Sequence, residues 1–200
     1  MQITNNNYQL YSQCEQKINA TSKSDSFKID STKTEPLNEQ YIKNYNKIIS
    51  AISKNDSSTP YPIATAEQSV QFFQEQQQNG LRMSPLLAPN SNLTDEFTDS
   101  YIKTYSNLDE KKSSLFLSLT MGAGLPTVEE INNKDILNSS SDTKNYISSV
   151  IDLFEKYEKE YPSQEYHSVN KNLFQQFYDN YLKALENKEI ENRTILNSYL

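Results

Sequence analysis

Few side chains in this sequence are of the types that carry out catalytic or metal chemistry. His167 is the only histidine and Cys14 the only cysteine, and they lie near opposite ends of the chain. Zinc sites need several Cys and His ligands, and a Ser-His-Asp triad on a nucleophile elbow needs a G-x-S-x-G motif, which is absent. We therefore expect no catalytic residue and no metal site. We interpret His167 as a histidine at the surface or at a helix end and Cys14 as an incidental thiol.

Two groups of carboxylates have spacings that place them on single helical turns. They are Asp95, Glu96 and Asp99, and Glu155, Glu158 and Glu160. Carboxylates bind Mg²⁺ or Ca²⁺, and pairs of them cleave glycosidic bonds, but the spacing of a calcium-binding EF-hand loop is missing. We expect these groups to be solvated helix faces and expect no cofactor. A carboxylate-based enzyme or small-ligand-binding protein stays as an alternative.

One glycine-containing turn resembles a phosphate-binding loop in outline only. The segment Met121–Thr127 contains Gly122 and Gly124 but lacks the Lys-Ser/Thr pair of a P-loop. Two glutamates, Glu129 and Glu130, follow at the start of the next expected helix and would repel an anion there. We interpret the segment as a tight turn between helices, with Gly122, Gly124 and Thr127 as candidate residues for contact with a ligand.

Charge and composition disfavour several classes of partner. The chain has 19 basic and 26 acidic residues, a formal net charge of −7, so binding to a nucleic acid backbone or to an anionic membrane surface is not expected. A single cysteine excludes a disulfide within the chain. The longest apolar run, residues 115–125, is far shorter than the roughly 20 residues of a membrane span. We expect a soluble, acidic protein without a transmembrane segment.

The first 35 residues differ from the rest. They are rich in Asn, Ser, Lys and Thr, and their apolar residues follow no sustained period, so we predict a flexible, disordered tail over 1–35 and a helical domain over 36–200. The segment has no charged region followed by an apolar one, so no cleavable signal peptide is expected. In composition the tail is similar to those read by flagellar and type III export machines. We expect a cytoplasmic protein, or one exported without a cleavable signal peptide, such as a secreted effector.

The rest of the chain favours helices. It has three glycines in all, and its one Asn-Gly pair, Asn79-Gly80, lies at the end of an expected helix and does not join two alternating strand patterns, so hairpin signals are weak. Helix periodicity and caps predict helices over the following ranges: 36–54, 65–80, 94–108, 110–121, 127–137, and the two arms of an αα-hairpin within 142–187, with a frayed helix over 188–200. The fold class is all-α: a single irregular bundle of about six to seven helices with a C-terminal αα-hairpin.

Two segments should supply much of the core. The apolar helix over residues 110–121 is expected to be the central and most buried helix, ended by Gly122 and Gly124. The segment Leu81–Pro89 contains four large apolar residues and two prolines, so we expect an irregular strap packed on the domain.

The last hairpin carries the candidate partner-binding residues. Its main apolar row begins at Tyr166, and beside it lies a second row formed by Phe174, Tyr178 and Leu182. Exposed rings here would suit a protein partner, and the candidate residues are Tyr166, Phe174, Tyr178 and Leu182. We therefore interpret the chain as a non-enzymatic helical protein–protein interaction protein, an adaptor or a component of a larger apparatus. Export through the N-terminal tail is the alternative from a second class.

Overall fold

The computed structural model describes most of the chain after residue 36. The described residues are 37–55, 65–79, 83–89, 91–122, 125–126, 137 and 139–198. The chain divides into two units, Met1–Pro36 and Leu37–Leu200, and every described residue belongs to the second. The tail expected over 1–35, with Cys14, and the short helix expected over 127–137, apart from Leu137, therefore lie outside the described residues.

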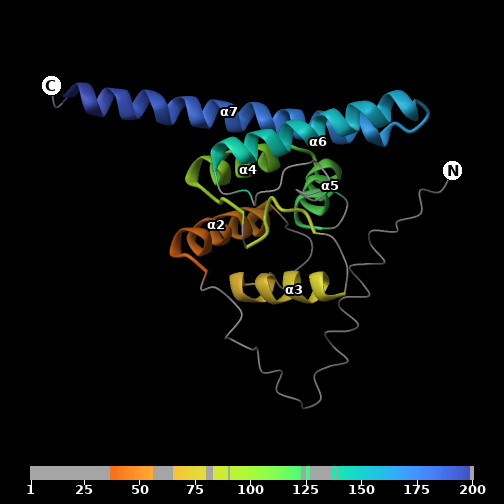
Figure 1. Ribbon diagram of the computed structural model, residues 1–200, viewed down its shortest axis with the longest axis horizontal. Coiled ribbons are helices and arrows are strands. Elements are labelled where there is room, and N and C mark those ends of the chain that lie inside the picture. Colours follow the sequence, from red (N-terminus) through yellow and green to blue (C-terminus); the bar gives the residue numbers. More distant parts are fainter. Residues whose placement is uncertain are drawn as a thin grey trace, which may run out of the picture. The chain divides into compact units, whose positions relative to one another are not determined.

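The described residues form six α-helices and no β-strand, which confirms the all-α class (Figure 1). The helices are α2 (Glu39–Asn55), α3 (Ala66–Gln78), α4 (Asp95–Ser106), α5 (Glu110–Met121), α6 (Ser140–Glu160) and α7 (Tyr166–Ser198).

Side-chain caps define where several of these helices begin. Thr65 and Gln68 form the expected capping box: the Gln68 amide donates to Thr65 Oγ1 at 3.3 Å, and the Thr65 amide donates to Gln68 Oε1 at 2.7 Å. The first helix begins at Glu39 rather than near Pro36, because Asn38 Oδ1 accepts a hydrogen bond from the Tyr41 amide at 2.7 Å. Local hydrogen-bonding chemistry thus sets these boundaries.

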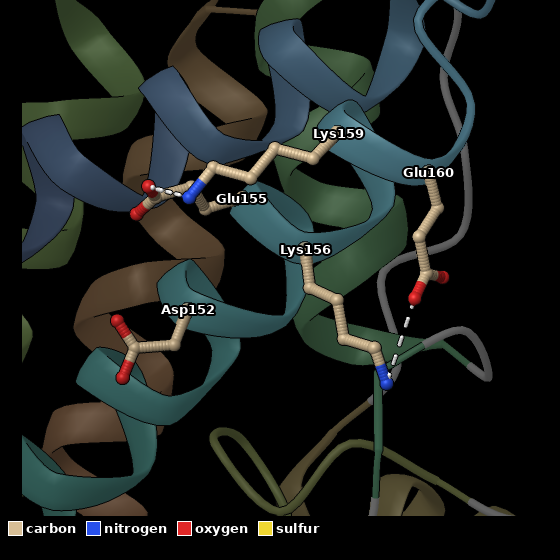
Figure 2. Close-up of a pocket in the computed structure, with 5 residues that line it drawn as sticks. All are labelled: Asp152, Glu155, Lys156, Lys159 and Glu160. Carbon is tan, nitrogen blue, oxygen red and sulfur yellow. Dashed lines mark hydrogen bonds and ion pairs between the residues drawn. The ribbon is translucent and has the colours of Figure 1, made fainter.

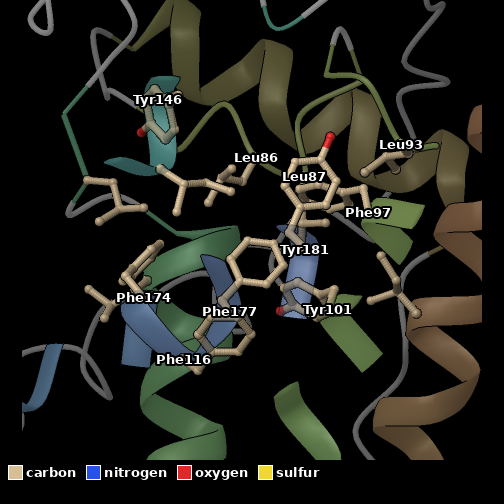
Figure 3. Close-up of a cluster of buried hydrophobic side chains, with 14 of the residues drawn as sticks. Leu86, Leu87, Leu93, Phe97, Tyr101, Phe116, Tyr146, Phe174, Phe177 and Tyr181 are labelled. Atoms are coloured by element: carbon tan, nitrogen blue, oxygen red, sulfur yellow. The ribbon is translucent and has the colours of Figure 1, made fainter. Parts of the chain in front are cut away.

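Within the core, aromatic rings from three helices meet (Figure 3). Phe97 and Tyr101 of α4 and Phe116 of α5 meet Phe177 of α7, with ring centroids 5.4, 5.9 and 5.5 Å apart and mostly edge-to-face. Edge-to-face pairs are the geometry that aromatic quadrupoles prefer. All four side chains are at most 1% exposed. A chain poor in aliphatic residues thus builds its core from rings.

The centre of the domain differs from the expectation. The apolar helix has the predicted bounds, Glu110–Met121, but it packs beside α4 and α7, and Leu115 and Leu117 are only half-buried. It is α4 that contacts α2, α5 and α7 together. The expectation weighed the number of apolar residues in α5, whereas the large rings that fill the core lie mainly on α4 and α7.

Gly122 ends α5 for a steric reason. A Cβ atom at this position would lie 2.7 Å from the Ser118 carbonyl oxygen, closer than side-chain carbons come to backbone. The Gly122 carbonyl accepts a hydrogen bond from the Ser84 amide at 3.3 Å. This joins the end of α5 to the strap, whose Leu86 and Leu87 are buried, as expected for this segment.

The predicted C-terminal hairpin is formed by α6 and α7, which lie side by side (Figure 1). It lies over α4 more than over α5, in keeping with the shifted centre of the domain. The second arm is longer than predicted, because α7 continues as one helix of 33 residues to Ser198. Residues 186–195 of α7 are all exposed, and this end extends past the other helices in Figure 1.

Candidate functional site

The structure separates the four candidate partner-binding residues on α7. Phe174 is fully buried and packs its ring against Phe116 and Phe154, so it belongs to the core. Tyr178 is half-buried, whereas Leu182 is 39% exposed and Tyr166 54% exposed. A row of residues four apart advances by about 40° around the helix at each step. From Phe174 to Leu182 the row therefore leaves the core, whereas Tyr166 is exposed at the start of the helix.

Of the three candidate loop residues, the structure describes Gly122 alone. Gly122 is the C-cap of α5 and carries the contacts with Ser118 and Ser84 described above. Gly124 and Thr127 lie outside the described residues. Packing at the end of α5 therefore explains why residue 122 is a glycine.

The most distinctive surface feature is a group of rings at the turn between α6 and α7. We call it the hairpin tip and define it as Tyr157, Tyr161, Gln164, Tyr166 and His167. The His167 ring lies 5.3, 6.2 and 4.0 Å, centroid to centroid, from the three tyrosine rings. His167 is the second residue of α7, which agrees with the expectation of a histidine at the surface or at a helix end, but it is only 7% exposed.

Hydrogen bonds fix the orientation of these rings. The Tyr166 hydroxyl donates to Gln164 Oε1 at 2.7 Å, and His167 Nε2 lies 3.1 Å from the same oxygen. Because a carboxamide oxygen only accepts, we assign the proton to Nε2. His167 Nδ1 is then an acceptor, and among the described residues neither it nor the buried Asn170 Oδ1 has a hydrogen-bond partner.

Tyr161 and Tyr166 are exposed to solvent, although the His167 ring between them is buried. Tyr161 is 49% and Tyr166 54% exposed, on either side of the short turn that contains Pro162. Sequence reasoning singled out Tyr166 but not Tyr161 or His167 as members of one group. The spacing that brings these rings together is visible in the sequence. Tyr157 and Tyr161 are four residues apart, and the five residues 161–165 link α6 to Tyr166 and His167 at the start of α7.

The carboxylates of α6 lie on an exposed face, as expected (Figure 2). An open depression of about 410 Å³ is lined by Asp152, Glu155, Lys156, Lys159 and Glu160. Lys159 Nζ donates to Glu155 Oε1 at 2.7 Å, and this hydrogen bond holds the pKa of Glu155 below its usual value. Lys156 Nζ lies 3.8 Å from Glu160 Oε1. Exposed pairs of this kind contribute little to stability.

The carboxylates of α4 are paired with lysines from other helices. Lys47 of α2 donates to Asp95 at 3.2 Å and lowers its pKa. Glu96 is more enclosed, with a side chain 10% exposed, and pairs with Lys188 of α7. Burial raises its pKa, but the hydrogen bond from Lys188 and backbone donors outweigh burial and keep the pKa below the usual value. Among the described residues, no three His, Cys, Asp or Glu side chains gather in a way that could hold a metal ion.

The fold and the tip together define a helical bundle with an aromatic surface at one end of its C-terminal hairpin. Comparison of the chain with protein-family models, with curated proteins and with solved structures found no match. None of the described helices is both long and apolar enough to cross a membrane.

Proposed function

We propose that this chain is a helical protein-interaction domain, an adaptor or a component of a larger apparatus, that binds a protein partner through the hairpin tip. The observation that carries the proposal is the pair of exposed rings, Tyr161 and Tyr166, held against the buried His167. Tyrosine is enriched among the residues that dominate binding energy at interfaces, because its ring offers a large contact area and its hydroxyl a hydrogen bond.

The tip is also pre-organised. Tyr166 is bonded to Gln164, and Tyr157 and Tyr161 contact the same histidine ring, so little side-chain freedom remains to be lost on binding. Low ordering cost raises affinity for a given contact area. Tyr157 packs against the core cluster and anchors the tip, whereas Tyr161 and Tyr166 are large and exposed.

The arrangement of carboxylates favours this proposal over a carboxylate-based enzyme. Glycosidases hold two carboxyl groups across one bond, with one group kept protonated by its surroundings. Here Asp95, Glu96 and Glu155 each pair with a lysine, and the pKa of each is lowered.

The proposal is tested by placing a photo-crosslinking phenylalanine analogue at position 161 or 166 in the cells that make the protein. The matched control carries it at Asn145, an exposed position on α6 away from the tip. We expect one discrete crosslinked protein from positions 161 and 166 and none from 145. The Tyr161→Ala, Tyr166→Ala double variant should stay helical and lose capture of that protein. The same crosslinks from all three positions, or none from 161 and 166, would refute the proposal.

A further inference from the structure

The two exposed tyrosines of the hairpin tip each follow a glutamate. The pair Glu-Tyr occurs twice within residues 160–166, as Glu160-Tyr161 and Glu165-Tyr166, and all four side chains are exposed. The turn between the two pairs is tight, because the Gln164 amide donates to the Tyr161 carbonyl at 3.0 Å. The tip therefore presents two rings and two carboxylates on one short turn.

The charges near the tip are unequally paired. Among the described residues, Glu165 has no ion pair and no side-chain hydrogen bond. Each lysine within residues 155–171, by contrast, has an acidic partner, and Figure 2 shows the first two of these pairs: Lys156 with Glu160, Lys159 with Glu155, and Lys171 with Glu158. The pair made by Glu160 joins two exposed groups at 3.8 Å and is weak. The tip thus has one free carboxylate and one that is loosely held, and no lysine there lacks an acid.

Acceptors without a partner gather at the tip. Among the described residues, the Glu165 carboxylate lacks a donor at the surface, and His167 Nδ1 and Asn170 Oδ1 lack one beneath the rings. The faces of the tyrosine rings are negative as well, through the quadrupole of the π system. An anion at the start of α7 would gain from the helix dipole but would meet Glu160 and Glu165. The tip is therefore complementary to a cation that donates hydrogen bonds.

We infer that the tip binds an arginine side chain of its partner protein, with the guanidinium stacked on the exposed rings of Tyr161 and Tyr166 and hydrogen-bonded to Glu165. This inference rests on the proposed function and adds the chemistry of the partner. A guanidinium is planar, stacks on aromatic faces and donates two parallel hydrogen bonds to one carboxylate, whereas a lysine ammonium is a strongly hydrated point charge. The net charge of −7 also attracts a basic partner from a distance.

The experiment uses a defined probe, the capped peptide acetyl-Gly-Arg-Gly-amide, added to the full chain labelled with nitrogen-15. Shifts of the backbone amide signals of residues 161–167 in NMR spectra report the dissociation constant. We expect saturable shifts at the tip. The same peptide with citrulline, which keeps the shape of arginine without its charge, should bind about fivefold more weakly. The peptide with lysine should also bind more weakly than the arginine peptide.

Variants of the chain locate the contact. Glu165→Gln removes the free charge and should weaken binding of the arginine peptide about fivefold. Tyr161→Ala removes one ring and should weaken it about two- to fivefold, whereas Tyr161→Phe keeps the ring and should bind nearly as well as the original chain. Glu186→Gln is the matched control, because it makes the same change at an exposed position about 30 Å along α7, and it should leave binding unchanged.

Helix content by circular dichroism shows that each variant is folded. Absence of shifts at the tip would overturn the inference, as would equal binding of the arginine peptide and either the citrulline or the lysine peptide. Unchanged binding by Glu165→Gln would overturn it too. Discrete crosslinks from positions 161 and 166, together with no preference for the arginine peptide, would refute this inference and leave the proposed function intact.

Discussion

Tyrosine hydroxyl groups connect the core of this domain to its non-helical segments. Tyr41 of α2 donates to the Leu87 carbonyl at 3.2 Å, and Tyr146 of α6 donates to the Pro126 carbonyl at 2.5 Å. The Tyr101 hydroxyl lies 2.7 Å from Thr120 Oγ1. A buried hydroxyl without such a bond would cost about 1–3 kcal/mol. Each ring therefore both fills the core and holds a neighbouring segment in place.

This arrangement predicts loss of stability in alkali. Burial raises the pKa of Tyr41, Tyr146 and Tyr181 above the ordinary value near 10. Since the folded state holds these protons more tightly than the unfolded state, their contribution is fully present below about pH 10 and is lost as the pH rises further. We expect the melting temperature to fall above that pH.

Absorbance at 295 nm and circular dichroism at 222 nm, recorded together across the alkaline range, provide the measurement. Ionisation of the last tyrosines should coincide with loss of helix. Ionisation of all 14 tyrosines while the helical signal persists would contradict the prediction.

Burial of individual side chains is the part of the site that the sequence predicted least well. The tip combines residues on both sides of a turn, and the depth of His167 depends on where Tyr157 and Tyr161 lie after the chain reverses. Phe174 and Leu182 belong to one apolar row, yet the first is buried and the second exposed. Only the packing of α7 on α4 and α6 decides where along the row the core ends.

At the level of helices, α5 shows the difference between apolar content and burial. The Phe116 side chain is 0% exposed, whereas its neighbour Leu117 is half-buried. Phe116→Ala should lower the free energy of unfolding by about 3–5 kcal/mol, because it removes a ring that contacts Tyr101, Phe174 and Phe177. Leu117→Ala should cost only about 1–2 kcal/mol, since part of its side chain already faces water.

Urea unfolding followed by circular dichroism measures both changes. Equal losses for the two variants would mean that α5 presents its Leu117 face to the core as fully as its Phe116 face, contrary to the structure.

Helix boundaries were largely predictable because local chemistry sets them. The helices predicted over 65–80 and 94–108 are capped by Thr65 and Thr94, and α5 has its predicted bounds. The start of α2 differed from the predicted residue 36 because Asn38 caps the helix. The helix that occupies the centre was not predictable from hydrophobicity alone, since α4 gains its position from Phe97 and Tyr101, whose rings pack on side chains distant in sequence.

For the whole molecule, the division of the chain after Pro36 yields a direct prediction. A fragment comprising residues 37–200 should fold by itself, because the core cluster seen among the described residues lies within that unit. Its free energy of unfolding in urea should match that of the full chain within about 0.5 kcal/mol, the range of changes at sites away from packing. A fragment that is unfolded, or markedly less stable, would contradict the prediction.

The same fragment separates the proposed function from the export alternative. If residues 1–35 direct export, the fragment stays in the cell while it keeps its capture of a partner through Tyr161 and Tyr166. Secretion of the fragment at the level of the full chain would sink the export alternative.

The unbroken length of α7 has a consequence for how the domain is used. The hairpin tip begins this helix, and Glu186 lies 20 residues further along, a distance of about 30 Å at the rise of an α-helix. A standard interface covers about 800 Å² of each partner, a patch about 16 Å in radius. A protein bound at the tip therefore does not reach the exposed residues 186–195, and the two ends of α7 stay separate surfaces.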